Sequence, residues 1–146
     1  MSAITLSNYH QSVPLYPTRE ILGANPYALR FVTGKIQQNQ DVSLDANNAY
    51  LLPIGSIVGL ASSGTNSGYY VLWNSTAADG SQTPVGVLFE SMDTSQGVQP
   101  ATIMTGGSVL QDKLLAASGT TIPPAGTILT GTEIQLEASV VPGAPF

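Results

Sequence analysis

The stretch IGSIVGLASSGTNSGYYVLWNSTAADGSQTPVGVLF, residues 54–89, decides the fold, because apolar runs alternate in it with clusters of turn residues. Residues 54–60 are mainly apolar, and residues 69–73 are aromatic or β-branched except for one leucine. The cluster SSGTN at 62–66 separates the two runs. Two strand-like runs joined by a short loop that contains Gly predict a β-hairpin.

Further short strands follow the hairpin at close intervals. Residues 85–89 come after an Asp-Gly turn at 79–80, and their unbroken apolar character predicts a strand buried on both faces. Residues 99–104 predict a fourth strand. We interpret the Gly pair at 106–107 as a turn that leads into a short strand at 108–110.

The C-terminal part predicts a short helical segment and a last pair of strands. Residues 111–117 are suited to one or two helical turns, with an Asp near the start and a Gly just past the end. Residues 127–129 and 133–138 predict two strands around Gly131. Glu, Gln and Glu alternate with Ile, Leu and Ala in the second of them, which is typical of a half-exposed antiparallel strand.

The first third of the chain has a different character. Residues 1–48 contain three prolines and a Gln- and Asn-rich run, and no strand or helix period persists in them, although residues 29–36 are suited to a short strand. Their aromatic side chains exceed what a purely solvated tail needs. We therefore predict an extended N-terminal arm over 1–48, whose aromatic side chains act as anchors, and a β-rich domain over 49–146.

The composition of the whole chain favours the same fold class. Charged residues make up only 9% of the chain, whereas an ordinary soluble domain has about 25%, and 15 Gly and 10 Pro are spread along the sequence. Such a chain suits short strands joined by tight turns. We predict a mainly β, compact single domain with one or two short helices and the N-terminal arm.

Charge and hydropathy exclude several classes of partner. The net charge is −5, and no basic stripe is present, so binding of nucleic acid through its phosphates is not expected. The longest apolar stretch, residues 50–61, is interrupted by Pro and Gly and is too short to span a bilayer. The N-terminal residues lack the basic start and apolar run of a signal peptide. We expect a soluble protein with no membrane partner.

Residue types that carry catalysis or bind metals are scarce. The chain has no Cys and one His, His10, and no basic residue follows Lys113. Thiol and Ser-His-Asp chemistry, His-ligated metals and a C-terminal phosphate clamp are therefore not expected. Trp73 could stack on a ligand, but its place in an aromatic strand favours the core or a subunit interface. We predict a protein that is not an enzyme and needs no cofactor.

One series of residues resembles a known family. An aromatic strand ends near Trp73, the turn Asp79-Gly80 follows, and Pro84 opens the run PVGVL, which contains Gly86. This order is similar to that of the lambda-type phage head decoration proteins, over residues 55–115. Gly86 fits a place where a side chain would block the close approach of a neighbouring strand or loop.

The resemblance implies a compact fold of the β-tulip kind and a structural role in the phage particle. It implies a cement protein that sits on the capsid exterior of the mature, expanded head and stabilises the shell. It also implies homotrimers at three-fold positions and an N-terminal arm that becomes ordered on the major capsid protein and can add a strand to it. Such a protein is made in the host cytoplasm and ends in the virion.

The contacts of the arm are our inference from composition, because the arm is long and aromatic and is not matched to the family residue by residue. We expect the capsid-binding residues of the arm to be its aromatic and basic side chains, Tyr9, Tyr16, Arg19, Tyr27, Arg30 and Phe31. Two alternatives stay open. One is another virion module, associated with a tail or fibre, and the other is a small-molecule-binding β-barrel that uses Trp73, Tyr69 and Tyr70.

Overall fold

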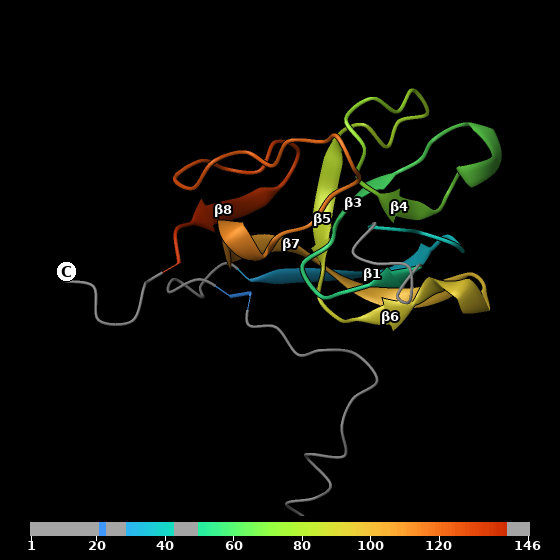
Figure 1. Ribbon diagram of the computed structural model, residues 1–146, viewed down its shortest axis with the longest axis horizontal. Coiled ribbons are helices and arrows are strands. Elements are labelled where there is room, and N and C mark those ends of the chain that lie inside the picture. Colours follow the sequence, from blue (N-terminus) through green and yellow to red (C-terminus); the bar gives the residue numbers. More distant parts are fainter. Residues whose placement is uncertain (1–20, 23–28, 43–49, 140–146) are drawn as a thin grey trace, which may run out of the picture.

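One long strand, β7 (Gln99–Leu110), organises the sheet of this protein. The computed structural model describes residues 21–22, 29–42 and 50–139, and Figure 1 shows their arrangement. The remaining strands are β1 (Arg30–Ile36), β2 (Leu51–Leu52), β3 (Ile57–Leu60), β4 (Tyr70–Leu72), β5 (Pro84–Leu88), β6 (Met92–Asp93) and β8 (Glu133–Glu137). Three short 3-10 helices are also described, η2 (Gly64–Asn66), η3 (Thr94–Gln96) and η4 (Gln111–Lys113). The fold is mainly β, as predicted.

The main sheet closes on itself. Its strand order is β1-β4-β3-β5-β7-β8, and β1 also pairs with β7. Strands β1, β4, β3, β5 and β7 therefore form a ring, which β8 extends beyond β7. The contact that closes the ring between β1 and β4 is short, because its register consists of the single pair Ile36 and Tyr70. In Figure 1, β1 lies along β7, and β8 lies at the opposite end of the molecule from β4.

Both faces of the central strands are buried, which explains why their sequences are apolar without alternation. Val58, Leu88 and Ile103 belong to one hydrophobic cluster together with Ile36 of β1. Ile57, Val87 and Met104, which adjoin the first three residues in the chain, belong to a second cluster. This cluster also contains Ile21, Leu114, Leu129 and the apolar residues of β8. The prediction of strands over 54–60, 69–73 and 85–89 is confirmed by β3, β4 and β5, with shorter bounds for the first two.

The Gly pair at 106–107 is not a turn, so that prediction is wrong. Strand β7 continues through both residues to Leu110. Gly107 has φ +124°, and a Cβ there would lie 2.7 Å from Met104 Cε and 2.8 Å from Leu29 Cδ2. The glycine lets the strand bend where its partners change. Up to Gly106 the strand pairs with β1 and β5, and from Gly106 onward it pairs with β8.

The last strand has the predicted faces but not the predicted direction. Strand β8 alternates exposed and buried residues from Glu133 to Leu136, as the sequence indicates. Its pairing with β7 is parallel, whereas an antiparallel strand was predicted. The only antiparallel pairing described for β8 is the isolated bridge between Ile128 and Gln135. Residues 111–132 provide the long connection that a parallel neighbour requires.

Strand β1 lies inside the segment predicted as an arm. Its existence over 29–36 is confirmed, and it pairs with β7 from Arg30 to Ile36. Ile21 is buried, and its carbonyl oxygen accepts a hydrogen bond from the Leu110 N–H at 2.7 Å. The sheet therefore draws residues from both sides of the predicted boundary at residue 48. The rest of the predicted arm, residues 1–20, 23–28 and 43–48, lies outside the described residues.

Candidate interaction site

Strand β1 is the most exposed strand of the described sheet and the place where two predicted site residues lie. Five of its seven residues are exposed, and only Ile36 is buried. Phe31 is 44% exposed and Val32 is 41% exposed, although successive side chains of a strand point to opposite faces. Neither face of β1 is therefore fully covered at these two residues.

Over most of its length, one edge of β1 has no strand partner among residues 21–22, 29–42 and 50–139. The other edge pairs with β7, but toward β4 the register contains Ile36 alone. The Gln37 N–H donates to the Tyr70 carbonyl at 3.0 Å on this side. Because backbone groups alternate between the two edges of a strand, the N–H and C=O of Thr33 and Phe31 point to the same side. The part of this edge at residues 30–34, which has no strand partner among the described residues, is called the open edge and is the candidate site.

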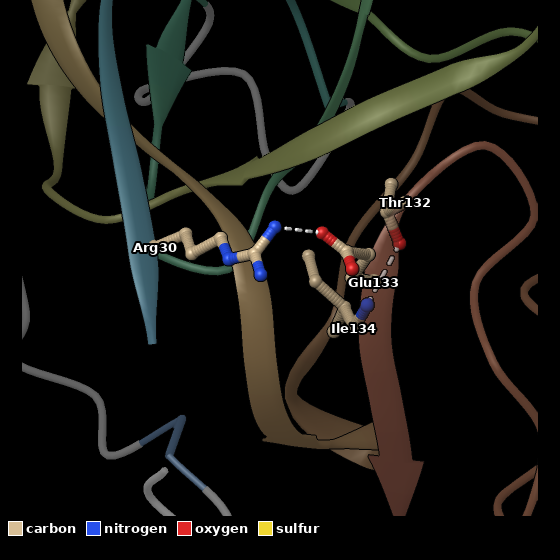
Figure 2. A network of polar contacts seen from close by, with 4 residues as sticks. All are labelled: Arg30, Thr132, Glu133 and Ile134. Carbon is tan, nitrogen blue, oxygen red and sulfur yellow. Dashed lines mark hydrogen bonds and ion pairs between the residues drawn. The ribbon is translucent and has the colours of Figure 1, made fainter. Parts of the chain in front are cut away.

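Two side-chain contacts lie at the N-terminal end of the open edge. The Arg30 guanidinium donates a hydrogen bond to the Glu133 carboxylate and forms an ion pair that joins β1 to β8 (Figure 2). Thr132 Oγ1 accepts the Ile134 N–H at 3.1 Å beside it, which fixes the start of β8. The rings of Phe31 and Phe89 meet edge to face, with centroids 5.0 Å apart. Both ends of the ion pair are more than half exposed, so it orients Arg30 rather than stabilising the fold strongly.

Gln37 and Gln40, which follow the C-terminal end of the open edge, make hydrogen bonds to distant segments. Both belong to the Gln- and Asn-rich run of the sequence. Gln40 Oε1 accepts the Leu72 N–H at 2.8 Å, which replaces a strand partner for β4. The Gln40 N–H donates to Thr94 Oγ1 at 2.9 Å, and Gln37 Nε2 donates to Asn66 Oδ1 at 3.2 Å. These contacts span 29 to 54 residues of sequence, so no local pattern could have indicated them.

Replacement of Gln40 by Ala is expected to destabilise the protein by about 1–3 kcal/mol, because the N–H of the buried Leu72 loses its acceptor. The matched control is Gln38→Ala. Gln38 is exposed, and among the described residues its side chain hydrogen-bonds to a distant segment only through the Ser95 carbonyl. Its change is expected to stay within about 0.5 kcal/mol. Urea unfolding of the three proteins measures both values, and equal losses for the two variants would contradict this role of Gln40.

The residues that carry the family resemblance lie in the core and in one turn, not in a cleft. Trp73 is 7% exposed, and its Nε1 donates to the Gln82 carbonyl at 2.8 Å. Pro84 is buried at the start of β5. A Cβ on Gly86 would lie 2.5 Å from Ile103 Cγ2 and 2.7 Å from the Met104 carbonyl oxygen. The expected close approach at Gly86 is therefore confirmed, and Trp73 is placed in the core rather than at a ligand.

Hydrogen bonds to the side chain and to the carbonyl of Asp79 hold the Asp79-Gly80 turn. Asp79 Oδ1 accepts the Ser81 N–H at 3.0 Å and the Ser81 hydroxyl at 2.5 Å. The Asp79 carbonyl accepts the Ser62 N–H at 2.8 Å, which ties the turn to the β3–β4 loop. Gly80 has φ +101°, a conformation that favours glycine. Asp93 Oδ1 accepts the Ser95 N–H and hydroxyl in the same way.

These two turns predict a loss of stability in acid. The Ser81 hydroxyl and N–H lower the pKa of Asp79 below its ordinary value of 3.8, and the same groups of Ser95 lower the pKa of Asp93. A carboxyl group with a lowered pKa stabilises the folded state above pH 3.8 and loses that contribution as the pH falls through its folded-state value. The melting temperature should therefore fall below about pH 4.

The variant Asp79→Asn/Asp93→Asn tests this prediction, since the amide oxygens can still accept hydrogen bonds but do not titrate. We expect its melting temperature to depend less on pH between pH 5 and 2.5 than that of the unchanged protein. The two single variants should fall in between. A double variant with the unchanged acid slope would show that other carboxylates account for the effect.

The described residues contain neither a cluster of metal-ligating side chains nor a membrane-spanning helix. No three His, Asp or Glu side chains among them come close enough to hold a metal ion. Within the same ranges, no helix has the length and the apolar character needed to cross a membrane. Of the predicted arm residues, Tyr9, Tyr16, Arg19 and Tyr27 lie outside the described residues, whereas Arg30 and Phe31 lie on β1. Their expected contact with a capsid stays a prediction.

Comparison with known proteins points to one family. A family model described as bacteriophage lambda head decoration protein D matches residues 25–134. The match covers 134 − 25 + 1 = 110 of 146 residues, from just before β1 to the start of β8. None of the curated proteins compared with the chain matches it. The matched region contains the candidate interaction site, the Asp79-Gly80 turn and Gly86.

Proposed function

The chain belongs to the bacteriophage lambda head decoration protein D family, and from this premise we propose that it binds the outside of the mature, expanded head and stabilises the shell. Proteins of this family are structural components of the phage head. The family match over residues 25–134 is the observation that carries the proposal. The major capsid protein is the proposed partner, and the capsid exterior is the proposed location after synthesis in the host cytoplasm.

The proposed mechanism is cementing by several weak contacts at once. We expect the N-terminal residues Tyr9, Tyr16, Arg19 and Tyr27 to bury aromatic area and add main-chain hydrogen bonds on the capsid. Homotrimers at three-fold positions would present three such arms together. Linked contacts raise each other's effective concentration, so individually modest interactions would become long-lived.

Two observations support this function over a small-molecule-binding barrel. Trp73, the main candidate for stacking on a ligand, is buried and donates its N–H to a backbone carbonyl. Val58, Leu72, Leu88 and Ile103 of the central strands pack together in one buried cluster. A core filled by its own side chains is suited to a rigid structural protein rather than to a ligand cavity. We propose that the protein has no enzymatic role.

The direct test mixes the purified protein with expanded capsids that lack decoration and measures the bound amount by sedimentation. We expect saturable binding and a higher temperature of capsid disruption at saturation, because a ligand that binds only the intact shell stabilises it. Unexpanded capsids of the same phage are the control. Absence of saturable binding to expanded capsids would reject the proposed function.

A further inference from the structure

The chain contains a peptide unit that is chemically labile in water, the one between Asp79 and Gly80. The nitrogen of the glycine can attack Cγ of the aspartate, because glycine has no side chain that hinders the approach. The nitrogen then loses its proton and the protonated carboxyl loses its OH, so water leaves and a cyclic succinimide forms. Water opens the ring at either carbonyl, which restores aspartate or gives isoaspartate, whose main chain runs through Cβ.

The fold requires both residues of this labile pair. Gly80 has φ +101°, and a Cβ there would overlap Ser62 Oγ and lie 3.0 Å from the Ser62 backbone nitrogen, so a side chain is not accommodated. Asp79 Oδ1 accepts the N–H of Ser81 at 3.0 Å and its hydroxyl at 2.5 Å. Replacement of either residue would therefore remove the lability only at a cost to the turn.

Hydrogen bonds hold both polar groups of the peptide unit. Its C=O, from Asp79, accepts the Ser62 N–H at 2.8 Å and the Ser63 N–H at 3.2 Å. Its N–H, from Gly80, donates to Gln82 Oε1 at 2.9 Å. Ring closure needs the peptide unit to rotate until its nitrogen faces the carboxyl carbon, because a reaction requires close and aligned atoms. This rotation would break hydrogen bonds at both ends of the unit.

The carboxyl group of Asp79 is held in its unreactive form. The hydroxyl and the N–H of Ser81 lower the pKa of this carboxyl group. An ionised carboxylate has no OH to lose, so it is a poor electrophile for ring closure. Asp79 and Gly80 are only half-buried, so the turn is not shielded from water. The restraint comes from hydrogen bonds rather than from burial.

A second turn with the same residue order provides an internal comparison. Residues 93–96 repeat the order Asp-x-Ser-Gln of residues 79–82, and Asp93 Oδ1 accepts the N–H and hydroxyl of Ser95. A β-branched threonine follows this aspartate, which hinders attack, and its N–H donates to a backbone carbonyl at 2.8 Å. The side chain of Gln96 donates to the Ser95 hydroxyl instead. Of the two turns, glutamine holds the amide N–H where glycine leaves the nitrogen unhindered.

We propose that the hydrogen bonds of the Asp79-Gly80 turn protect this peptide unit from isomerisation, and that Gln82 completes the restraint by holding the Gly80 N–H. Isoaspartate would lengthen the main chain at a turn that Ser62 ties to the β3–β4 loop. The turn also leads into β5, which pairs with β3 and β7. Protection of this unit therefore preserves the path of the chain into the sheet. This inference concerns the isolated chain and does not depend on the proposed function.

The experiment measures isoaspartate at position 79 in full-length protein incubated in neutral buffer. Mass spectrometry with electron-transfer fragmentation distinguishes isoaspartate from aspartate at each position. The folded protein is compared with the same protein unfolded in urea. We expect at least about tenfold faster isomerisation in urea, because the hydrogen bonds of the peptide unit and of the carboxylate are lost together. Equal rates in the folded and unfolded states would overturn the inference.

The variant Gln82→Ala tests the side chain that holds the Gly80 N–H. It leaves the Gln82 carbonyl in place, which accepts the Trp73 indole N–H. Isomerisation at Asp79 should become roughly two- to tenfold faster, the change expected for one hydrogen bond. The matched control is Gln96→Ala, which removes the exposed glutamine of the second turn and should leave the rate at Asp79 unchanged. Equal rates in Gln82→Ala and the unchanged protein would overturn the role of Gln82.

A variant that is destabilised elsewhere separates local protection from global unfolding. Gln40→Ala is expected to lose more stability than Gln82→Ala, but it leaves the hydrogen bonds of the turn in place. It should raise isomerisation only through its larger unfolded fraction. Gln82→Ala should therefore isomerise faster than Gln40→Ala, although urea unfolding shows it to be the more stable of the two. An equal or reversed order of the rates would show that global unfolding controls isomerisation and would overturn the inference.

Discussion

Replacement of Gly86 by Val is expected to destabilise the protein by about 3 kcal/mol or more, a large part of the stability of a domain of this size. The space that a side chain would need is already filled by Ile103 Cγ2 and the Met104 carbonyl oxygen. Both belong to β7, so relief requires the separation of β5 from the strand that organises the sheet. Gly86→Ala should cost on the order of 1–3 kcal/mol for the same reason.

A double-mutant cycle separates this steric effect from a general cost of losing glycine. Ile103→Ala removes the Cγ2 atom, so it should offset part of the loss in Gly86→Ala, with a coupling of about 1 kcal/mol. The control is Gly64→Ala, where φ is +77° but no atom lies within 4 Å of the added Cβ. That variant should lose stability through backbone strain alone and show no coupling to Ile103. Additive losses for Gly86→Ala and Ile103→Ala, measured by urea unfolding, would contradict the steric explanation.

Deletion of residues 1–20 is expected to abolish binding to expanded capsids while the folded domain remains intact. The deletion must end there, because Ile21 is 1% exposed and its carbonyl accepts the Leu110 N–H. It removes Tyr9, Tyr16 and Arg19, half of the predicted arm contacts, and leaves β1 complete. Since the arms of one oligomer act together, the loss of affinity should exceed about 100-fold.

The deletion is measured by sedimentation with capsids and by the melting temperature and oligomeric state of the free protein. The matched variant is full-length protein with Tyr9→Ala and Tyr16→Ala, which keeps the arm but removes two anchors and should bind at an intermediate level. Unchanged capsid occupancy after the deletion would reject the arm as the means of attachment. A deletion variant that no longer folds would show instead that these residues belong to the domain.

The candidate site could be predicted only in part from sequence. The residue types of Arg30 and Phe31 predict contact residues of the arm, and the structure places both on an exposed strand. Their partners Glu133 and Phe89 lie 103 and 58 positions away, so no local pattern connects them. The role of Gln40 was missed for the same reason, because its amide replaces a strand partner for Leu72, 32 positions away.

The sequence by itself determined the class of the fold, the positions of most strands and the absence of the usual catalytic residue types. These features depend on local properties, namely β-branched and aromatic runs, turn residues such as Asp79-Gly80, and residue counts. Gly86 could also be interpreted locally, because a glycine inside an apolar strand indicates close packing.

Only the tertiary structure decided the path of the chain through the sheet. It carries β7 through Gly106 and Gly107, pairs β8 parallel to β7, and builds β1 into the ring of strands. Each of these features depends on which distant strand supplies the next hydrogen-bond partner. Strand propensity is a property of neighbouring residues. Strand pairing depends on which of several distant segments forms the better hydrogen bonds and packing, so the local sequence pattern does not determine the pairing.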